Sequence, residues 1–130
     1  LRLADMLLIY AEATARSAAG TDRATAVGYI NQIRRRGFGL PITTPSATAD
    51  ISDAQLTANF VLDERAREMH WEATRRTDLI RYGQFTTSTY LWPWKGGVAA
   101  GRSVAATRNV FPLPLADLTA NPNLKQNDGY

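Results

Sequence analysis

The sequence predicts a mainly α-helical fold: a tetratricopeptide-like helical hairpin, a long third helix, irregular loops and an extended C-terminal tail. Three observations support this prediction. Apolar residues recur every three or four positions over residues 1–36 and again over 53–82. The stretch between them, 37–52, is rich in proline, glycine, serine and threonine, which is typical of a loop. Near the end of the chain, Pro112 and Pro114 bar an interior β-strand.

The hairpin consists of one predicted helix over residues 1–18 and a second over about 22–36. The connection is only a few residues long, so the two helices should be antiparallel neighbours. Gly20 is the expected C-terminal cap of the first helix, and Thr21 caps the second, with Asp22 in its first turn. The apolar stripes of the two helices are Leu1, Ala4, Leu7, Leu8, Ala11 and Ala15, then Ala26, Val27, Ile30 and Ile33.

A capping box gives the third helix the clearest start signal in the chain. It consists of Ser52 followed three residues later by Gln55. We predict one long helix over 53–82, which either ends near residue 73 or continues beyond it with a kink. Its apolar stripe is Ala58, Leu62, Ala66, Met69 and Ala73.

The remaining segments carry no helical periodicity. Residues 84–109 are predicted to form an irregular loop with a cluster of aromatic residues. Residues 110–130 form a C-terminal segment that starts with the extended run VFPL, and Leu115–Ala120 can make one helical turn.

The composition excludes several classes of site. The chain has 130 residues, 45% hydrophobic and 21% charged, as in ordinary globular proteins. It has no cysteine and one histidine, His70, so we predict no metal site and no cofactor. No apolar run approaches the roughly 18 residues of a membrane-spanning helix. Because the sequence starts at Leu1 inside a helical pattern, we expect it to be the C-terminal region of a longer protein, with any targeting signal upstream.

Three glutamates follow one another at steps of four and would share one helix face: Glu64, Glu68 and Glu72. Two carboxylates side by side can serve a glycosidase. Each glutamate, however, has an arginine within helical reach, which is Arg67 for Glu64, Arg65 for Glu68, and Arg75 or Arg76 for Glu72. Neighbouring arginines favour the ionised carboxylate, whereas a general acid must hold a proton. We therefore predict ion pairs here and no catalytic residue.

A run of three arginines, Arg34 to Arg36, precedes Phe38 and is one pattern of RNA-binding segments. The same run is typical of a helix C-terminus, where cations complement the helix dipole and Gly37 ends the helix. The formal net charge of +3 is modest. We favour the helix end and predict no nucleic-acid partner.

The aromatic cluster Tyr90, Trp92 and Trp94 is the candidate ligand-binding feature. Exposed aromatic rings can stack on the apolar face of a sugar, and Tyr90 or Lys95 could then donate hydrogen bonds to sugar hydroxyls. The alternative, which we favour, is a loop held to the protein body by its own aromatic side chains.

Five blocks of the sequence occur together and in the same order in one protein family. They are LRLADMLLIYAEA, INQIRRRG, LDERAREMHWEATRRTDLIRYG, VFPLP and NPNLKQNDGY. With these blocks the chain resembles the C-terminal region of the SusD/RagB family, the surface glycan-binding lipoproteins of Bacteroidetes. Two positions depart from the family pattern. Ala73 replaces a glycine, so the residue that would permit a kink is missing there, and Asp128 replaces a proline.

The resemblance implies a mostly α-helical protein with tetratricopeptide-like hairpins and no enzymatic activity. It also implies a lipoprotein on the outer-membrane surface, anchored through a cysteine outside this chain, that captures oligosaccharides for a SusC-like TonB-dependent transporter. The glycan-contacting aromatics of the family lie largely upstream, so no binding residue is carried over by motif. The alternative is a structural or protein-interaction module without a ligand site of its own, which an exposed apolar face on the first helix would favour.

Charged residues, most of them at the family's charged positions, lie on helices that also carry apolar stripes. We expect them to form a partly buried ion-pair network between helices. They are Asp5, Glu12, Arg34, Arg36, Glu64, Arg65, Glu68, Glu72, Arg75, Asp78 and Arg81.

Overall fold

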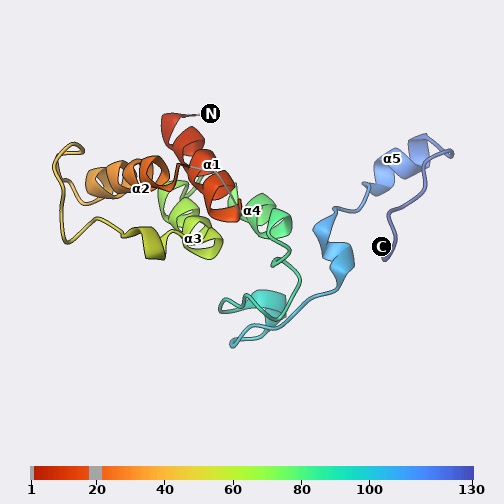
Figure 1. Cartoon of the computed structure of the whole chain (residues 1–130). Helices are drawn as coiled ribbons and strands as arrows, with labels where there is room; N and C mark the ends of the chain where they lie inside the picture. Colours follow the sequence, from red (N-terminus) through yellow and green to blue (C-terminus); the bar gives the residue numbers. More distant parts are fainter. Residues whose placement is uncertain (1, 18–21) are drawn as a thin grey trace. The chain divides into compact units, whose positions relative to one another are not determined.

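The computed structural model describes residues 2–17 and 22–130 (Figure 1). Over these residues the predicted mainly α-helical fold is confirmed, and they form no strand. The α-helices are α1 (Leu3–Arg16), α2 (Arg23–Gly37), α3 (Ala58–Glu68), α4 (Arg75–Arg81) and α5 (Leu115–Ala120), and the 3₁₀ turns are η1 (Asp53–Gln55), η2 (Lys95–Gly97) and η3 (Ala106–Asn109). The chain divides into two compact units, a first unit of Leu1–Arg75 and a second unit of Arg76–Tyr130.

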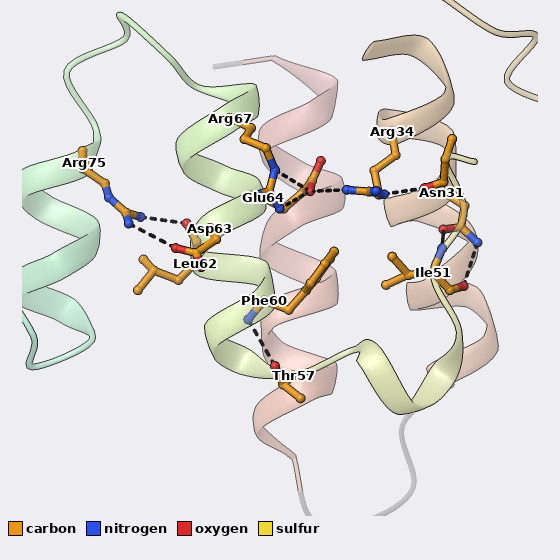
Figure 2. A network of polar contacts seen from close by, with 11 residues as sticks. Asn31, Arg34, Ile51, Thr57, Phe60, Leu62, Asp63, Glu64, Arg67 and Arg75 are labelled. Carbon is orange, nitrogen blue, oxygen red and sulfur yellow. Dashed lines mark hydrogen bonds and ion pairs between the residues drawn. The ribbon is translucent and has the colours of Figure 1, made fainter. Parts of the chain in front are cut away.

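Helices α1 and α2 form the predicted hairpin. The start of α1, at Leu3, and the end of α2, at Arg36, line the same surface depression, so the two helices run antiparallel (Figure 2). Six residues of the predicted stripes are buried, namely Ala4, Leu8, Ala11, Ala26, Ile30 and Ile33. The stripe residues Leu7, Ala15 and Val27 are partly buried, and Leu1 lies outside the described residues. Asp22 is the N-cap of α2 rather than a first-turn residue, because its carboxylate accepts the Thr25 backbone N–H at 2.9 Å. Gly20 and Thr21, the predicted caps, lie outside the described residues.

The prediction of one long helix over 53–82 is wrong. The segment contains η1, α3 and α4 as separate elements. The capping box is present, with the Ser52 backbone N–H donating to Gln55 Oε1 at 2.8 Å, but it caps only the single 3₁₀ turn η1. Helix α3 has its own cap, since the Thr57 hydroxyl accepts the Phe60 backbone N–H at 3.1 Å (Figure 2).

A turn between α3 and α4 interrupts the apolar pattern that predicted the long helix. Trp71 and Ala73 both adopt left-handed backbone conformations, with φ values of 66° and 57°. Ala73 is exposed and therefore does not continue the stripe, whereas Val61, absent from the predicted stripe, is fully buried. The turn is thus made without the glycine that would adopt this backbone at no steric cost.

The core of the first unit lies where α1 packs against both α2 and α3. Leu8, Ile30, Val61 and Leu62 are its largest fully buried side chains. The 38–52 loop is attached to this core through Asn31 of α2.

Asn31 bonds the backbone of Ile51 in both directions, as Oδ1 accepts the Ile51 N–H at 2.8 Å and Nδ2 donates to the Ile51 carbonyl at 3.3 Å (Figure 2). Arg35 binds Asp50 in the same loop, and its guanidinium holds the pKa of that carboxyl below its ordinary value.

Ion pairs between the long side chains of arginine and glutamate join α2 to α3. Glu64 of α3 has a side chain only 6% exposed and accepts Arg34 Nη1 of α2 at 3.0 Å and Arg67 Nη2 at 2.6 Å (Figure 2). One helical turn further, Glu68 accepts Arg36 of α2 together with Arg2, which precedes α1. Charged hydrogen bonds between long side chains therefore bridge the two helices.

A further pair joins α1 to α3, and it differs from the expected helical neighbours. Arg65 Nη1 lies 2.9 Å from Asp5 Oδ1. The predicted pair of Arg65 with Glu68 is replaced by the pairs of Glu68 with Arg2 and Arg36. Glu72 pairs with Arg2 at 2.6 Å rather than with Arg75 or Arg76, because the turn after Glu68 removes it from the helix face.

The remaining predicted charged residues form local contacts. Arg75 turns back to the Leu62 carbonyl at 2.8 Å and to Asp63 at 3.3 Å (Figure 2). Arg16 binds Glu12 at 2.8 Å within α1, and Arg81 binds Asp78 at 2.9 Å within α4.

The second unit contains little helix, and its C-terminal tail is held by hydrogen bonds to the segment after η3. The side-chain amide of Gln126 bonds both the N–H and the carbonyl of Leu113, at 2.7 and 2.9 Å. The Tyr130 hydroxyl donates to the Val110 carbonyl at 2.9 Å. The predicted helical turn Leu115–Ala120 is present as α5.

The left-handed backbone at Ala73 leads to the first prediction. Ala73→Gly should raise the free energy of unfolding by about 1 kcal/mol, because glycine adopts positive φ without a Cβ penalty. The matched control, Ala66→Gly inside α3, should lower it by a similar amount, about 0.5–1 kcal/mol. Thermal melts measure both, and a melting temperature for Ala73→Gly at or below that of the parent chain would contradict the argument.

The interhelix ion pairs lead to the second prediction. Arg65→Ala should cost about 3 kcal/mol, because it removes the Arg65 partner of the largely buried Asp5 carboxylate. Glu68→Ala should cost less, about 1 kcal/mol, because Arg2 keeps its pair with Glu72 and Arg36 is half exposed. Asp53→Ala is the control: it removes a 65% exposed carboxylate that pairs with Arg23 and should cost less than about 1 kcal/mol. Thermal melts measure the loss, sugar affinity should stay unchanged, and normal melting curves for both Arg65→Ala and Glu68→Ala would refute the network.

Candidate functional site

The predicted aromatic residues lie on the loop between α4 and η3, in the second unit. The Trp92 ring stacks on Phe85 with 6.2 Å between ring centroids, and Tyr90 lies tilted against it at 6.4 Å. Trp94 differs, since it is 70% exposed and adopts a left-handed backbone conformation with φ 68°. Two of the three predicted rings are therefore packed together, and the third projects into solvent.

Lys95 fixes the shape of this loop. Its side chain is buried, and Nζ donates to the carbonyls of Thr87 and Tyr90, both at 2.6 Å, and of Gln84 at 3.4 Å. The ammonium also lies 4.7 Å from the centre of the Trp92 ring. Burial lowers the pKa of Lys95. All three N–H donors of the ammonium therefore point at loop carbonyls, so Lys95 positions Trp92 and has no donor left over for a sugar hydroxyl.

Trp92 and Lys95 line a cavity of about 340 Å³ that we call the aromatic pocket. Its walls come from α4, the 84–104 loop, the segment after η3 and the C-terminal residue. The lining residues are Arg76, Phe85, Trp92, Lys95, Gly96, Val104, Arg108, Val110, Phe111, Pro112 and Tyr130. The pocket combines four aromatic side chains with three basic ones, and its lining includes no carboxylate side chain.

Arg76 at the start of the second unit organises the pocket. Its guanidinium lies 4.0 Å from the ring centre of Phe111 and 5.1 Å from that of Phe85, so it connects two segments far apart in sequence. Nη2 donates to the Arg108 carbonyl at 2.8 Å, and the Arg108 guanidinium in turn lies 5.4 Å from the Tyr130 ring.

Gly129 brings Tyr130 to the pocket wall. Its φ is 85°, and a Cβ at this position would lie 2.4 Å from Thr107 Cγ2. Only glycine allows the tail to pass this close to η3.

The sequence pointed to part of this pocket. Trp92 and Lys95 line it and Tyr90 supports it, whereas Trp94 is not among the lining residues. Sequence reasoning missed the other aromatic and basic walls, which are Phe85, Phe111, Tyr130, Arg76 and Arg108. No spacing rule links residues up to 54 positions apart, and the only available signal was that VFPLP and NDGY belong to the blocks of the family resemblance.

Residues considered for other chemistries are engaged elsewhere. Glu64, Glu68 and Glu72 each accept an arginine. The three arginines at the end of α2 bind Glu64, Asp50 and Glu68, in chain order. In the part of the chain that the structure describes, no three His, Asp or Glu side chains gather as a metal site. Among the same residues, no helix combines the length and apolar character needed to span a bilayer.

Helix α1 carries a second apolar face that the first unit leaves uncovered. Leu3, Met6, Ile9 and Tyr10 are between 39% and 73% exposed. They lie opposite the buried stripe of the same helix, which contains Leu8 and Ala11.

The helical fold is shared with solved structures of the SusD superfamily. The chain belongs to the SusD family, whose model matches residues 1–130. This confirms the resemblance found in the sequence blocks.

Individual relatives agree with this assignment. The starch-binding protein SusD of Bacteroides thetaiotaomicron is 42% identical over 99% of the chain. A SusD homologue of known structure from the same organism is 32% identical over the whole chain, with a TM-score of 0.73. A surface glycan-binding protein A, also from Bacteroides thetaiotaomicron, is 28% identical over 96% of the chain, with a TM-score of 0.69. The chain spans only 21%, 26% and 23% of the lengths of these three proteins.

Proposed function

We propose that the chain is the C-terminal region of a surface protein that binds glycans without transforming them. The aromatic pocket is the observation that carries this proposal. Trp92, Phe111 and Tyr130 line the same pocket, and aromatic rings of this kind complement the apolar face of a sugar. Two relatives of the chain are named as a starch-binding protein and a surface glycan-binding protein, which supports the same class of ligand.

Non-covalent capture fits the chemistry of the described residues better than hydrolysis does. A glycosidase needs two carboxyl groups facing one sugar, one of them protonated. The lining of the aromatic pocket contains no Asp or Glu side chain. The glutamates that could have formed such a pair, Glu64 and Glu68, are bound by arginines of the first unit and do not line the aromatic pocket. Oligosaccharides incubated with the protein should therefore be recovered unchanged.

The partner and location follow from the family rather than from the site. We expect the intact protein to pass its ligand to a SusC-like TonB-dependent transporter in the outer membrane. We also expect it to be held at the cell surface by a lipidated cysteine outside this chain.

The aromatic pocket allows a matched test with two tryptophans of the same loop. Trp92→Ala should lower oligosaccharide affinity about ten-fold or more, because it removes a stacking surface. Trp94→Ala, which removes an exposed ring outside the pocket, should leave the affinity unchanged. Isothermal titration of the full-length protein with an oligosaccharide panel measures both.

Two controls keep this test interpretable. Trp92→Phe keeps a ring and should recover part of the affinity, and thermal melts establish that each variant is folded. Equal affinities for Trp92→Ala, Trp94→Ala and the parent protein would remove the pocket from the binding site.

A second function is favoured by the uncovered apolar face of α1. A face formed by Leu3, Met6, Ile9 and Tyr10 suits packing against another helix, either from the rest of the same protein or from a partner. In this second function the chain is a protein-interaction module with a structural role, and its pocket binds no sugar.

Light scattering tests whether the uncovered α1 face mediates protein association. The isolated chain should self-associate through the uncovered face, and Ile9→Glu should return it to a monomer. Leu115→Glu is the control, because Leu115 on α5 is also highly exposed but lies outside that face. If the parent chain is monomeric at all concentrations, the α1 face does not mediate self-association.

A further inference from the structure

The arginines of this chain fall into two groups. Ten of the 13 form ion pairs with Asp or Glu side chains in the described part of the chain. The other three, Arg76, Arg102 and Arg108, have no carboxylate partner among residues 2–17 and 22–130. All three line the aromatic pocket or the depression beside it. The three arginines without a carboxylate partner therefore lie together, at the aromatic pocket and the depression beside it.

The neighbouring depression extends the aromatic pocket. It has a volume of about 490 Å³, is lined by Arg102, and shares Gly96, Val104 and Arg108 with the aromatic pocket. We call the two depressions together the basic groove. Lys95 also lines the groove, with its donors bound to loop carbonyls, and the lining of the basic groove includes no Asp or Glu side chain.

The charge of the whole chain is concentrated in the same unit. The first unit holds nine basic and nine acidic side chains and is formally neutral. The second unit holds six basic and three acidic side chains, so the entire formal net charge of +3 belongs to it. A concave site with one sign of charge raises the local concentration of oppositely charged ligands.

The unpaired arginines retain hydrogen-bond donors for a ligand. A guanidinium carries five N–H donors. Arg76 uses Nη2 for the Arg108 carbonyl, and Arg102 uses Nε for the Gly96 carbonyl at 3.0 Å. These acceptors are neutral and leave the positive charges uncompensated. The Arg76 guanidinium also contacts the rings of Phe85 and Phe111, which restricts its motion within the pocket.

We infer that the basic groove selects an anionic oligosaccharide, whose sugar ring stacks on the aromatic pocket while its carboxylate or sulfate groups bind Arg108 and Arg102. This inference rests on the proposed glycan-binding function and narrows its ligand class. Arginine forks match carboxylate and sulfate oxygens, whereas a neutral sugar would leave the cations of the groove unpaired. The rings alone would accept either kind of sugar, so the arginines supply the selectivity.

The test compares glycans that differ only in charge, using the full-length protein. Isothermal titration is performed with an oligogalacturonide against its full methyl ester, and with a sulfated galactan oligosaccharide against its desulfated form. We expect at least one anionic form to bind about ten-fold or more tightly than its neutral counterpart. Its affinity should fall as NaCl is raised, and the pair that responds distinguishes carboxylate from sulfate.

Single-charge variants locate the effect. Arg108→Gln and Arg102→Gln should each lower the affinity for the anionic form about ten-fold and leave the neutral form nearly unchanged. Lys125→Gln is the control, because it removes one positive charge from an exposed residue that does not line the groove. Its ratio of anionic to neutral affinity should equal that of the parent protein. Unchanged melting temperatures verify that all three variants fold.

Four outcomes would overturn the inference. Equal affinity for charged and neutral forms, or an unchanged ratio in Arg108→Gln, would reject the anionic ligand while leaving glycan binding intact. No binding of either form would reject both this inference and the proposed function. A ten-nucleotide single-stranded RNA that binds more tightly than every acidic glycan and depends on Arg108 would assign the groove to nucleic acid.

Discussion

The first unit depends on a buried carboxylate, Glu64, held between Arg34 of α2 and Arg67 of its own helix. Helix α1 packs on both neighbours through apolar residues that include Ala4, Leu8 and Ala11, and charged side chains join α2 to α3. These Arg–Glu pairs connect the two helices directly. The guanidinium groups of Arg34 and Arg67 also lie 5.7 and 5.8 Å from the centre of the Phe60 ring, within cation–π distance. Charge pairing here fixes the arrangement of the helices as well as contributing to stability.

The second unit is organised differently, around a cation placed between aromatic rings. Leu79 is the only hydrophobic side chain of Arg76–Tyr130, all of which the structure describes, that is buried as core. Arg76 instead joins Phe85 to Phe111, and Lys95 gathers three carbonyls of the loop under Trp92. A unit built in this way needs no continuous apolar core, and its rings stay near the surface, where a ligand can reach them.

The two units therefore use the same residue type for opposite purposes. In the first unit arginines are neutralised by carboxylates, which makes it formally uncharged. In the second unit Arg76, Arg102 and Arg108 bind only carbonyls and rings, so their charges remain available. This division connects stability to function. An arginine bound to a carboxylate stabilises the fold, whereas an arginine without a carboxylate partner can still bind an anion.

The sequence by itself determined the helical class, the hairpin and its buried stripes, and the family. Leu8 and Ile30 could be placed in the core because helical periodicity is a local property of the chain. The i, i+4 pair of Glu12 with Arg16 was equally accessible, for the same reason.

Only the tertiary structure decided where the long helix breaks and what the pocket contains. The apolar pattern runs through Ala73, yet the backbone there is left-handed, and an alanine gives no sign of that. Glu68 is bound by Arg2 and Arg36 and Arg65 by Asp5, all more than 30 residues away, so helical spacing could not identify these pairs. The walls of the aromatic pocket are likewise brought together from 76 to 130 by stacking and hydrogen bonds that no local pattern encodes.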